Sequence, residues 1–300
     1  MPTLIVIAGP TASGKTDLSL QLAKAYNAEI ISADARQFYR KMDIGTAKPS
    51  PQQLADVKHH FIDFLDPSAE YNAGQFEKEA ITFLSQYFET NEICILTGGS
   101  GMYINAVTEG FDDLPSTPIS IREKFNVIYE NKGITYLQEL LKSADPQYFE
   151  EVDIHNKQRI QRALEAIEVS GKPFSELRKK QKQKRKFAIQ KIVLTPTRQD
   201  LYLRINNRVD EMVKAGLLEE VKSLMNLKNC NALQTVGYQE LFEYLEGSKT
   251  FEEAIDKIKQ HTRNYAKRQT TWFRKQSNYV SFSSNEFDRI KRHLDESLNV

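Results

Sequence analysis

The chain has 300 residues, enough for one large domain and a smaller one. Its 41 basic and 40 acidic residues leave a net charge of +1, so bulk charge indicates no particular partner. Two cysteines cannot form a disulfide framework, no apolar run approaches the roughly 18 residues of a membrane span, and no signal-peptide pattern opens the sequence. We therefore expect a soluble cytoplasmic protein with no membrane partner.

A strand, a loop and a helix are predicted at the start of the chain. Residues 4–8 are an apolar run typical of a buried parallel strand, and residues 17–26 have the apolar spacing of a packed helix. Between them, residues 9–16 (GPTASGKT) fit the phosphate-loop pattern G-x-x-x-x-G-K-[ST] at every position. In such a loop the backbone N–H groups bind phosphate, Lys15 reaches the outer phosphate, and the Thr16 hydroxyl is placed to ligate Mg²⁺. The predicted phosphate-binding residues are Gly9, Pro10, Thr11, Ala12, Ser13, Gly14, Lys15 and Thr16.

Strand and helix patterns then alternate. Strands are predicted at residues 28–34, 61–65 and 93–97, and helices at residues 76–88 and 102–108. This alternation predicts an α/β fold, a P-loop NTPase-like parallel sheet flanked by helices. Ligands of such sheets lie beyond the carboxyl ends of the strands, so the phosphate loop, Asp34 and the stretch 98–101 (GGSG) should line one crevice.

The pattern changes at residues 112–118, where two prolines and small polar residues indicate a linker. Helical patterns follow at residues 121–131, 136–143 and 155–169, strand character returns at 187–194, and further helices are predicted at 201–225 (broken near Gly216), 238–245 and 251–274. We predict a core made of residues 1–112 and 188–300, with an all-helical insertion domain at residues 113–187.

Several polar residues are candidates for chemistry. Asp34, at the end of a predicted strand, can be a Mg²⁺ ligand, a general base or a helix cap. Ser100 sits among glycines that let its hydroxyl approach a ligand, although a plain tight turn has the same pattern. Arg204 and Arg208 share a helix face and suit a diphosphate, or they belong to a solvated face. The pair His59–His60 lacks the further ligand spacing of a zinc site.

Two basic stretches lie further along. Residues 178–186 (RKKQKQKRK) hold seven basic residues in nine, which favours either polyanion binding or a solvated arm. Residues 261–275 interleave basic side chains with Tyr265, Trp272 and Phe273. Basic groups contact phosphates and aromatic rings stack on unpaired bases, but the same pattern describes an amphipathic helix with its rings in the core. We expect Trp272 to be mostly core and the basic side to face outward.

Taken together, these stretches resemble the tRNA dimethylallyltransferase family, also called tRNA isopentenyltransferases, from Leu4 to about Arg274. The motifs that carry the resemblance are GPTASGKT at 9–16, SADARQFYRKMDIGTAKP at 32–49, HHFID at 59–63, LTGGSGMYINAV at 96–107, QRIQRALEAIEVSGKP at 158–173, RINNRVDEMVKAGLLEEV at 204–221, TVGYQEL at 235–241 and RNYAKRQTTWFRK at 263–275.

The resemblance implies transfer of a dimethylallyl group from dimethylallyl diphosphate to the N6 amine of the adenosine 3′-adjacent to the tRNA anticodon. The phosphate loop would then hold a prenyl diphosphate, with Mg²⁺ as the cofactor. Asp34 matches the family's general base, and Ser100 a position that is usually threonine. Lys15, Thr16 and Arg208 match groups around the diphosphate and Mg²⁺. Nothing in the sequence requires a dimer, and we expect a monomer whose partner is the anticodon stem-loop of tRNA.

The resemblance also implies a set of RNA contacts. Ala35 departs from a common serine, which puts only a minor contact in doubt, and Arg122 matches a single contact in the helical insertion. The matching positions are Asp34, Ala35, Arg36, Gln37, Ser100, Arg122, Gln158, Arg159, Ile160, Gln161, Arg162, Gln234, Thr235, Val236, Gly237, Tyr238, Gln239, Lys267, Arg268, Gln269, Thr270, Thr271, Trp272, Phe273 and Arg274.

Three other functions are compatible with parts of the sequence. A small-molecule kinase would use the phosphate loop and Asp34 but leaves the basic and aromatic helix without a role. A prenyltransferase acting on free AMP or ADP leaves the helical insertion unused. An RNA-binding switch protein would use the nucleotide as a signal, and the crevice beside Asp34 argues against it.

Overall fold

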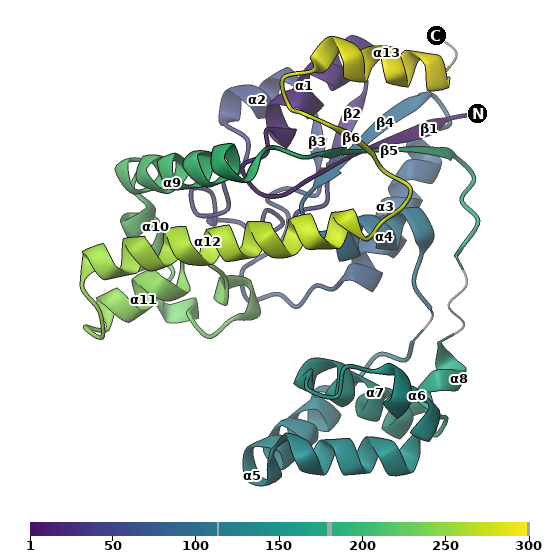
Figure 1. Cartoon of the computed structure of the whole chain (residues 1–300), viewed down its shortest axis with the longest axis vertical. Helices are drawn as coiled ribbons and strands as arrows, with labels where there is room; N and C mark the ends of the chain where they lie inside the picture. Colours follow the sequence, from purple (N-terminus) through teal and green to yellow (C-terminus); the bar gives the residue numbers. More distant parts are fainter. Residues whose placement is uncertain (113, 179–181, 299–300) are drawn as a thin grey trace. The chain divides into compact units, whose positions relative to one another are not determined.

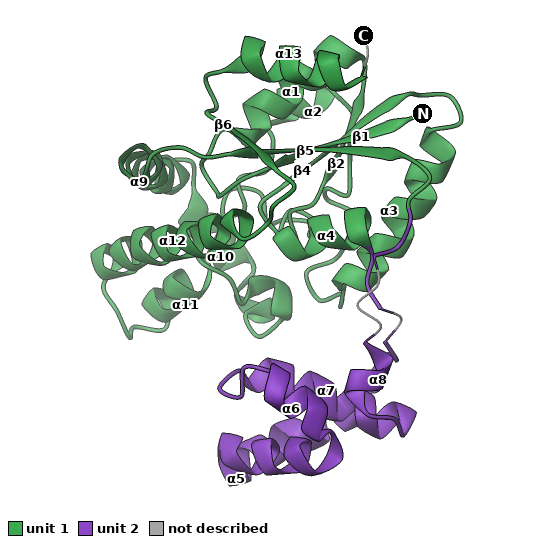
Figure 2. Ribbon diagram, turned by 45° about the vertical axis from the view of Figure 1, so that its right-hand side comes forward, with its two compact units in different colours: residues 1–109, 185–300 green, residues 110–184 purple. Residues whose placement is uncertain are grey.

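The computed structural model describes residues 1–112, 114–178 and 182–298 (Figure 1). The chain forms two compact units (Figure 2): unit 1 is Met1–Glu109 with Arg185–Val300, and unit 2 is Gly110–Lys184. The helical insertion predicted from the sequence spans residues 113–187, so each of its limits lies three residues after the corresponding limit of unit 2 (113 against 110, 187 against 184).

Among the described residues, six strands of unit 1 form one sheet in the order β3-β2-β4-β1-β5-β6, and every neighbouring pair is parallel. The predicted parallel sheet flanked by helices is therefore confirmed. The strands are β1 (Thr3–Ala8), β2 (Glu29–Ser32), β3 (His59–His60), β4 (Ile93–Gly98), β5 (Ala188–Leu194) and β6 (Val280–Phe282).

Helices cover both faces of this sheet (Figures 1 and 2). Alternate residues of β1 point to opposite faces, and Ile5 and Ile7 pack in a buried cluster with Leu22 of α1 and Leu294 of α13. Helices α3 and α4 lie against the other face. The helices of unit 1 are α1 (Lys15–Tyr26), α2 (Pro51–Asp56), α3 (Ala73–Tyr87), α4 (Gly101–Glu109), α9 (Arg198–Lys214), α10 (Leu217–Ser223), α11 (Gln239–Leu245), α12 (Phe251–Arg274) and α13 (Phe287–Leu298).

Two predictions of secondary structure need comment. The long helix predicted at 201–225 is broken at Gly216, as expected, because that glycine has a φ of 100° that starts α10. The strand predicted at 61–65 is wrong, since the strand is His59–His60. Phe61 and Asp63 have φ values of 60° and 57°, which end the extended path. The apolar spacing there reflects an aromatic cluster, in which the rings of Phe61 and Phe64 lie 5.7 Å apart.

Unit 2 has its own hydrophobic core, in which Leu137, Leu141, Ile160 and Phe174 pack together. Its described residues form helices and no strand, in line with the predicted all-helical insertion. The first helix contains a break at Gly133, whose φ is 72°. The helices are α5 (Ile119–Ala144), α6 (Pro146–Glu151), α7 (Lys157–Ser170) and α8 (Phe174–Leu177). Within residues 1–112, 114–178 and 182–298, no helix combines the length and apolar character needed to cross a bilayer.

Candidate functional site

A cavity of about 500 Å³ opens at the carboxyl ends of the strands of unit 1. Its walls come from the phosphate loop, the segment after β2, the glycine-rich loop after β4, helices α9 and α10, the residues before α11, and α12. The crevice predicted at the carboxyl ends of the parallel strands is therefore present. We call the part at residues 9–16 and Arg208 the phosphate end, and the part at Asp34, Ser100 and Tyr265 the carboxylate end.

The phosphate end is shaped by backbone that a side chain would obstruct. Gly9 has a φ of 152°, and a Cβ there would lie 2.8 Å from Ser13 Oγ and 3.0 Å from the Leu194 carbonyl oxygen. Gly14, with a φ of 91°, precedes the first turn of α1. Ser13 is fully buried, and its Oγ has no hydrogen-bond partner among the described residues. These features match a loop that closes around a group with its own polar atoms.

Two partly buried cations face this loop. The Lys15 ammonium donates a hydrogen bond to the Pro10 carbonyl at 2.7 Å, and Arg208 of α9 reaches Thr11 Oγ1 and the Ala47 carbonyl at 3.5 Å each. Burial lowers the pKa of Lys15 to about 8; Asp34 opposes this shift and Arg208 adds to it. Burial also lowers the pKa of Arg208. A site that keeps two desolvated cations together favours an anion between them.

Arg204 does not join Arg208 at the cavity. Its guanidinium donates to Ser284 Oγ at 3.1 Å, in the segment after β6. It still lies close to the phosphate loop, because a Cβ on Gly14 would be 3.8 Å from Arg204 Nη1. The two arginines share a helix face, as expected, but only Arg208 lines the cavity.

At the carboxylate end, Asp34 follows β2 by two residues. Its Oδ1 accepts a hydrogen bond from the Arg36 N–H at 3.0 Å, so the carboxylate closes a turn and does not cap an α-helix. Ser100 precedes α4, and its carbonyl accepts from the Tyr103 N–H at 2.9 Å. Both residues line the cavity. The expectation that Asp34 and the GGSG stretch share one crevice is met.

Tyr265 of α12 completes this end, and its role in the cavity was not predicted. Burial raises the pKa of its hydroxyl, and the nearby Asp34 carboxylate raises it further, while a hydrogen bond with Ser100 and the charges of Arg36 and Arg268 act in the opposite direction. The hydroxyl therefore stays protonated beside the carboxylate. The Arg268 guanidinium lies 5.7 Å from the centre of the Tyr265 ring. The interleaved aromatic pattern of residues 261–275 was the signal that could have identified it.

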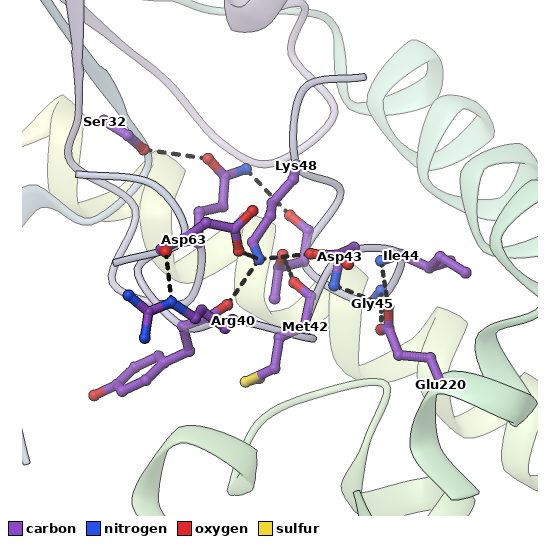
Figure 3. Close-up of polar contacts among 12 residues, drawn as sticks. Ser32, Arg40, Met42, Asp43, Ile44, Gly45, Lys48, Asp63 and Glu220 are labelled. Carbon is purple, nitrogen blue, oxygen red and sulfur yellow. Dashed lines mark hydrogen bonds and ion pairs between the residues drawn. The ribbon is translucent and has the colours of Figure 1, made fainter. Parts of the chain in front are cut away.

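Polar contacts hold the segment 37–48, which contributes Gln37, Gly45, Thr46 and Ala47 to the lining of the cavity (Figure 3). Gln37 accepts a hydrogen bond from Ser32 Oγ at 3.2 Å and donates to the carbonyls of Thr46 and Ala47 at 3.2 Å each. Its amide is thus used within the protein, although we predicted an RNA contact for it. Lys48, whose side chain is 4% exposed, donates to the Tyr39 carbonyl and to two aspartates of the same region.

The carboxylate of Glu220, on α10, holds the same segment. Glu220 accepts hydrogen bonds from three successive backbone N–H groups, at Asp43, Ile44 and Gly45, at distances of 2.7–2.9 Å. It also accepts from the Tyr238 hydroxyl at 2.7 Å. Both Glu220 and Lys48 fall within motifs that carry the resemblance, but neither was predicted as a site residue. The backbone partners of Glu220 lie more than 170 residues away in the chain, whereas the partners of Lys48 are the nearby Tyr39 carbonyl and two aspartate side chains.

The other predicted RNA-contacting residues of unit 1 fall into three groups: those that line the cavity, those exposed or partly buried on α12, and those that are buried. Gln234, Thr235, Val236, Gly237, Gln239, Arg268 and Gln269 line the cavity with Ala35 and Arg36. Lys267, Thr271 and Arg274 are exposed on α12, and Thr270 is partly buried. Tyr238 and Phe273 are buried. Trp272 is 39% exposed and not mostly core, because its indole lies over Gly101, where a Cβ would come within 2.0 Å of Nε1.

In unit 2, the predicted contact segment of α7 has two sides. Arg122, Gln158 and Arg159 are exposed. Ile160 is fully buried, and Gln161 is 7% exposed and donates to Asn126 Oδ1 at 3.0 Å. Both side chains pack within unit 2, which argues against a direct RNA contact; the contacts predicted for them stay predictions. Arg162 donates to the Pro115 carbonyl at 3.1 Å and to the Thr117 hydroxyl.

Two described arginines of the basic stretch 178–186 form ion pairs within the protein. Residues 179–181 lie outside the described residues. Arg178 pairs with Glu151 at 3.7 Å in unit 2. Arg185, in unit 1, has a side chain that is 8% exposed, pairs with Glu77 at 2.7 Å and donates to the Ala106 and Val107 carbonyls. At least one of its charges therefore has a structural role, which neither of our two interpretations included.

Comparison with known protein families shows which family the chain belongs to. A family model described as IPP transferase matches residues 37–276. The chain belongs to the IPP transferase family. It is 44% identical over 294 residues to tRNA dimethylallyltransferase 1 of Bacteroides thetaiotaomicron, covering 98% of this chain and 96% of that protein. It is 46% identical over 288 residues to the tRNA dimethylallyltransferase of Flavobacterium psychrophilum, covering 94% of each.

Solved structures agree with this IPP transferase assignment. A full-length tRNA isopentenylpyrophosphate transferase from Bacillus halodurans matches with a TM-score of 0.73 at 36% identity, over 100% of this chain and 96% of that one. A eukaryotic dimethylallyltransferase acting on tRNA matches with a TM-score of 0.83 at 28% identity, over 100% of this chain and 80% of that one.

The expected metal can be tested against the residues of this IPP transferase. Over the described part of the chain, no cluster of three or more His, Cys, Asp or Glu side chains could hold a metal alone. Mg²⁺ commonly takes only one or two protein ligands and completes its shell with water and substrate phosphate oxygens. Thr16 and Asp34 supply such oxygens in one cavity beside the phosphate loop. The donor set fits a Mg²⁺ ion that binds together with a diphosphate.

Proposed function

We propose that this protein transfers a dimethylallyl group from dimethylallyl diphosphate to the N6 amine of the adenosine 3′-adjacent to the anticodon of tRNA, giving N6-dimethylallyladenosine and diphosphate. One observation carries the proposal: a single cavity holds an anion cradle with the partly buried cations of Lys15 and Arg208 at one end and the Asp34 carboxylate at the other. The tRNA dimethylallyltransferases among its relatives support the choice of substrates.

The phosphate end binds the donor. Backbone N–H groups of Gly14, Lys15 and Thr16, at the N-terminus of α1, hold the diphosphate, and Lys15 and Arg208 stabilise the negative charge that grows on it as the allylic bond breaks. Ile205, Val209 and Met212 of α9 line the same cavity and offer apolar contact to a five-carbon chain. Thr16, with the diphosphate oxygens, would hold Mg²⁺. When bound, the ion neutralises part of the diphosphate charge.

The carboxylate end binds the acceptor. The target base must leave the stack of the anticodon loop to reach a cavity of this depth. Asp34 orients the exocyclic amine and takes its proton, while the nitrogen forms a bond to the allylic carbon and the bond from that carbon to the diphosphate oxygen breaks. Positioned proton transfer of this kind contributes roughly 10²–10⁴-fold to a rate. Ser100 and Tyr265 hold the carboxylate region by their hydroxyl groups.

Each unit, taken by itself, has exposed residues that suit contacts with RNA. Lys267 and Arg274 are placed to contact phosphates, and Arg122, Gln158 and Arg159 offer further contacts from unit 2. Contacts of this kind recognise the shape and backbone of a stem-loop more than its sequence. A separate small acceptor such as AMP or ADP would leave these side chains without a role.

The deciding test is incubation of the protein with labelled dimethylallyl diphosphate and total tRNA, followed by digestion and nucleoside analysis. We expect label in N6-dimethylallyladenosine and in no other nucleoside. Parallel reactions contain free AMP or ADP as the acceptor, or labelled ATP in place of the prenyl donor. Label in AMP or ADP but not in tRNA, or phosphoryl transfer from ATP without prenyl transfer, would show the proposal to be wrong.

A further inference from the structure

Helix α12 rests directly on both glycine-containing loops of the cavity. Gln269 makes the contact: its Oε1 accepts a hydrogen bond from the Thr11 N–H at 2.9 Å, and its Nε2 donates to the Gly99 carbonyl at 2.9 Å. The side chain is 7% exposed. One buried amide thus joins three segments that lie far apart in the sequence.

The chemistry of this contact admits few side chains. Thr11 offers an N–H and needs an acceptor, whereas Gly99 offers a carbonyl and needs a donor, so the orientation of the amide is fixed by its partners. A carboxylate could satisfy only Thr11, and a hydrocarbon neither. The backbone of Gly99 comes so close that a Cβ there would lie 2.2 Å from Gln269 Nε2. The loop and the amide fit each other closely.

The two loops carry the two ends of the cavity. Thr11 belongs to the phosphate loop and accepts a hydrogen bond from Arg208 on its hydroxyl. Gly99 directly precedes Ser100, which interacts with Tyr265 one turn before Gln269 on α12. The strands that lead into the two loops pair directly, with Ala8 opposite Gly98. Beyond the end of this pairing, Gln269 is the side chain that bridges the phosphate loop at Thr11 to the glycine-rich loop at Gly99.

We propose that Gln269 is a positioning residue that sets the distance between the diphosphate cradle and the carboxylate end, from the helix whose exposed side binds RNA. This inference rests on the proposed function and changes the role first predicted for Gln269, a direct RNA contact. Because the reacting atoms must meet at about 3–3.5 Å, a displacement of one loop by about 1 Å can cost on the order of 10²-fold in rate. Such a displacement leaves the RNA surface in place.

The test compares two variants at this position, Gln269→Glu and Gln269→Met, which keep the length of the side chain but remove one or both hydrogen bonds. The matched controls are Gln260→Glu and Gln260→Met, on an exposed position of the same helix. Steady-state transfer to an anticodon stem-loop is measured for each, with thermal melting to check folding. We expect kcat to fall by about 10- to 100-fold for the Gln269 variants, with KM for the RNA within about twofold of wild type. The controls should match the wild type.

The outcomes separate the inference from the proposed function. A wild-type protein that transfers no prenyl group contradicts the function before any variant is made. With an active wild type, unchanged kcat in both Gln269 variants overturns the inference. A loss confined to KM for the RNA overturns it too, because the amide would then contact RNA directly. If neither Gln269 variant folds while both controls do, the amide is a structural element only and the inference also fails.

Discussion

The phosphate end and the carboxylate end of the cavity are built in different ways. The phosphate end comes mostly from one continuous stretch, whose backbone conformation shapes the anion site. Burial lowers the pKa of Lys15 in the same stretch. The carboxylate end takes Asp34, Ser100 and Tyr265 from three elements, and Tyr265 is 38% exposed. A pre-formed anion site thus faces a more open site assembled from distant segments. Substitutions should therefore act on donor binding at one end and on turnover or RNA binding at the other.

The largest effect is expected for Asp34→Asn. Asparagine can still accept the hydrogen bond from the Arg36 N–H, so the turn is kept while the base is lost. We expect kcat to fall by about 10²–10⁴-fold, with RNA affinity close to that of the wild type. Single-turnover transfer and RNA binding are measured on the same preparation.

Asp66→Asn provides a matched control, because exposed Asp66 accepts a hydrogen bond from the Ser68 N–H in a turn of the same kind, away from the cavity. It should leave transfer unchanged. If Asp34→Asn turns over at the wild-type rate, Asp34 is not the base, and the carboxylate end would be a binding surface only.

The next largest effect concerns pH at the phosphate end. The pKa of Lys15 in the empty site is about 8, so the ammonium is charged below this pH and loses its proton above it. A bound diphosphate favours the charged form, and binding therefore takes up a proton at high pH. The affinity for dimethylallyl thiodiphosphate should be nearly constant from pH 7 to 8 and then fall by up to about tenfold per pH unit. Calorimetric titrations at several pH values measure it.

Two variants make this prediction specific. Lys15→Met should bind the analogue weakly, with no inflection near pH 8. Lys24→Met removes an exposed cation of the same helix, paired with Asp56, and should keep the inflection. An inflection that persists in Lys15→Met would assign the titration to another group.

The contrast between a site built from one stretch and a site built from distant segments also explains which features could be predicted from the sequence. The phosphate loop and the alternation of strands and helices could be predicted because each depends on local patterns. A parallel sheet then brings the carboxyl ends of its strands, and with them Asp34 and Ser100, to one edge. Glu220 could not be predicted, because its partners are backbone N–H groups more than 170 residues away in the chain. The resemblance named Gln269, but only the structure revealed that its amide is turned inward to Thr11 and Gly99.

Burial accounts for the remaining differences. A sequence motif marks Ile160 and Gln161 together with Gln158, but it does not say which side of α7 packs inward. In the structure the first two face the core of unit 2 and the third faces solvent. For Ile160 the amphipathic spacing of α7 contained this information, because residues 160, 163, 164 and 167 lie on one helix face. Gln161 is not part of that set, and its amide instead donates to Asn126 Oδ1. Comparing the motif with that spacing would have identified Ile160 as a core residue and Gln158 as a surface residue.

The smallest effect is expected at Tyr265, where ring and hydroxyl can be tested separately. If the ring stacks on the extruded base, Tyr265→Leu should raise KM for an anticodon stem-loop by roughly tenfold, since stacking on an aromatic side chain is worth about 1–3 kcal/mol per base. Tyr265→Phe keeps the ring and should stay within about threefold. Tyr202→Leu, on α9 outside the cavity, is the control. Equal losses in the Phe and Leu variants would instead mean that the hydroxyl beside Ser100 matters, and the carboxylate end would then be as rigidly positioned as the phosphate end.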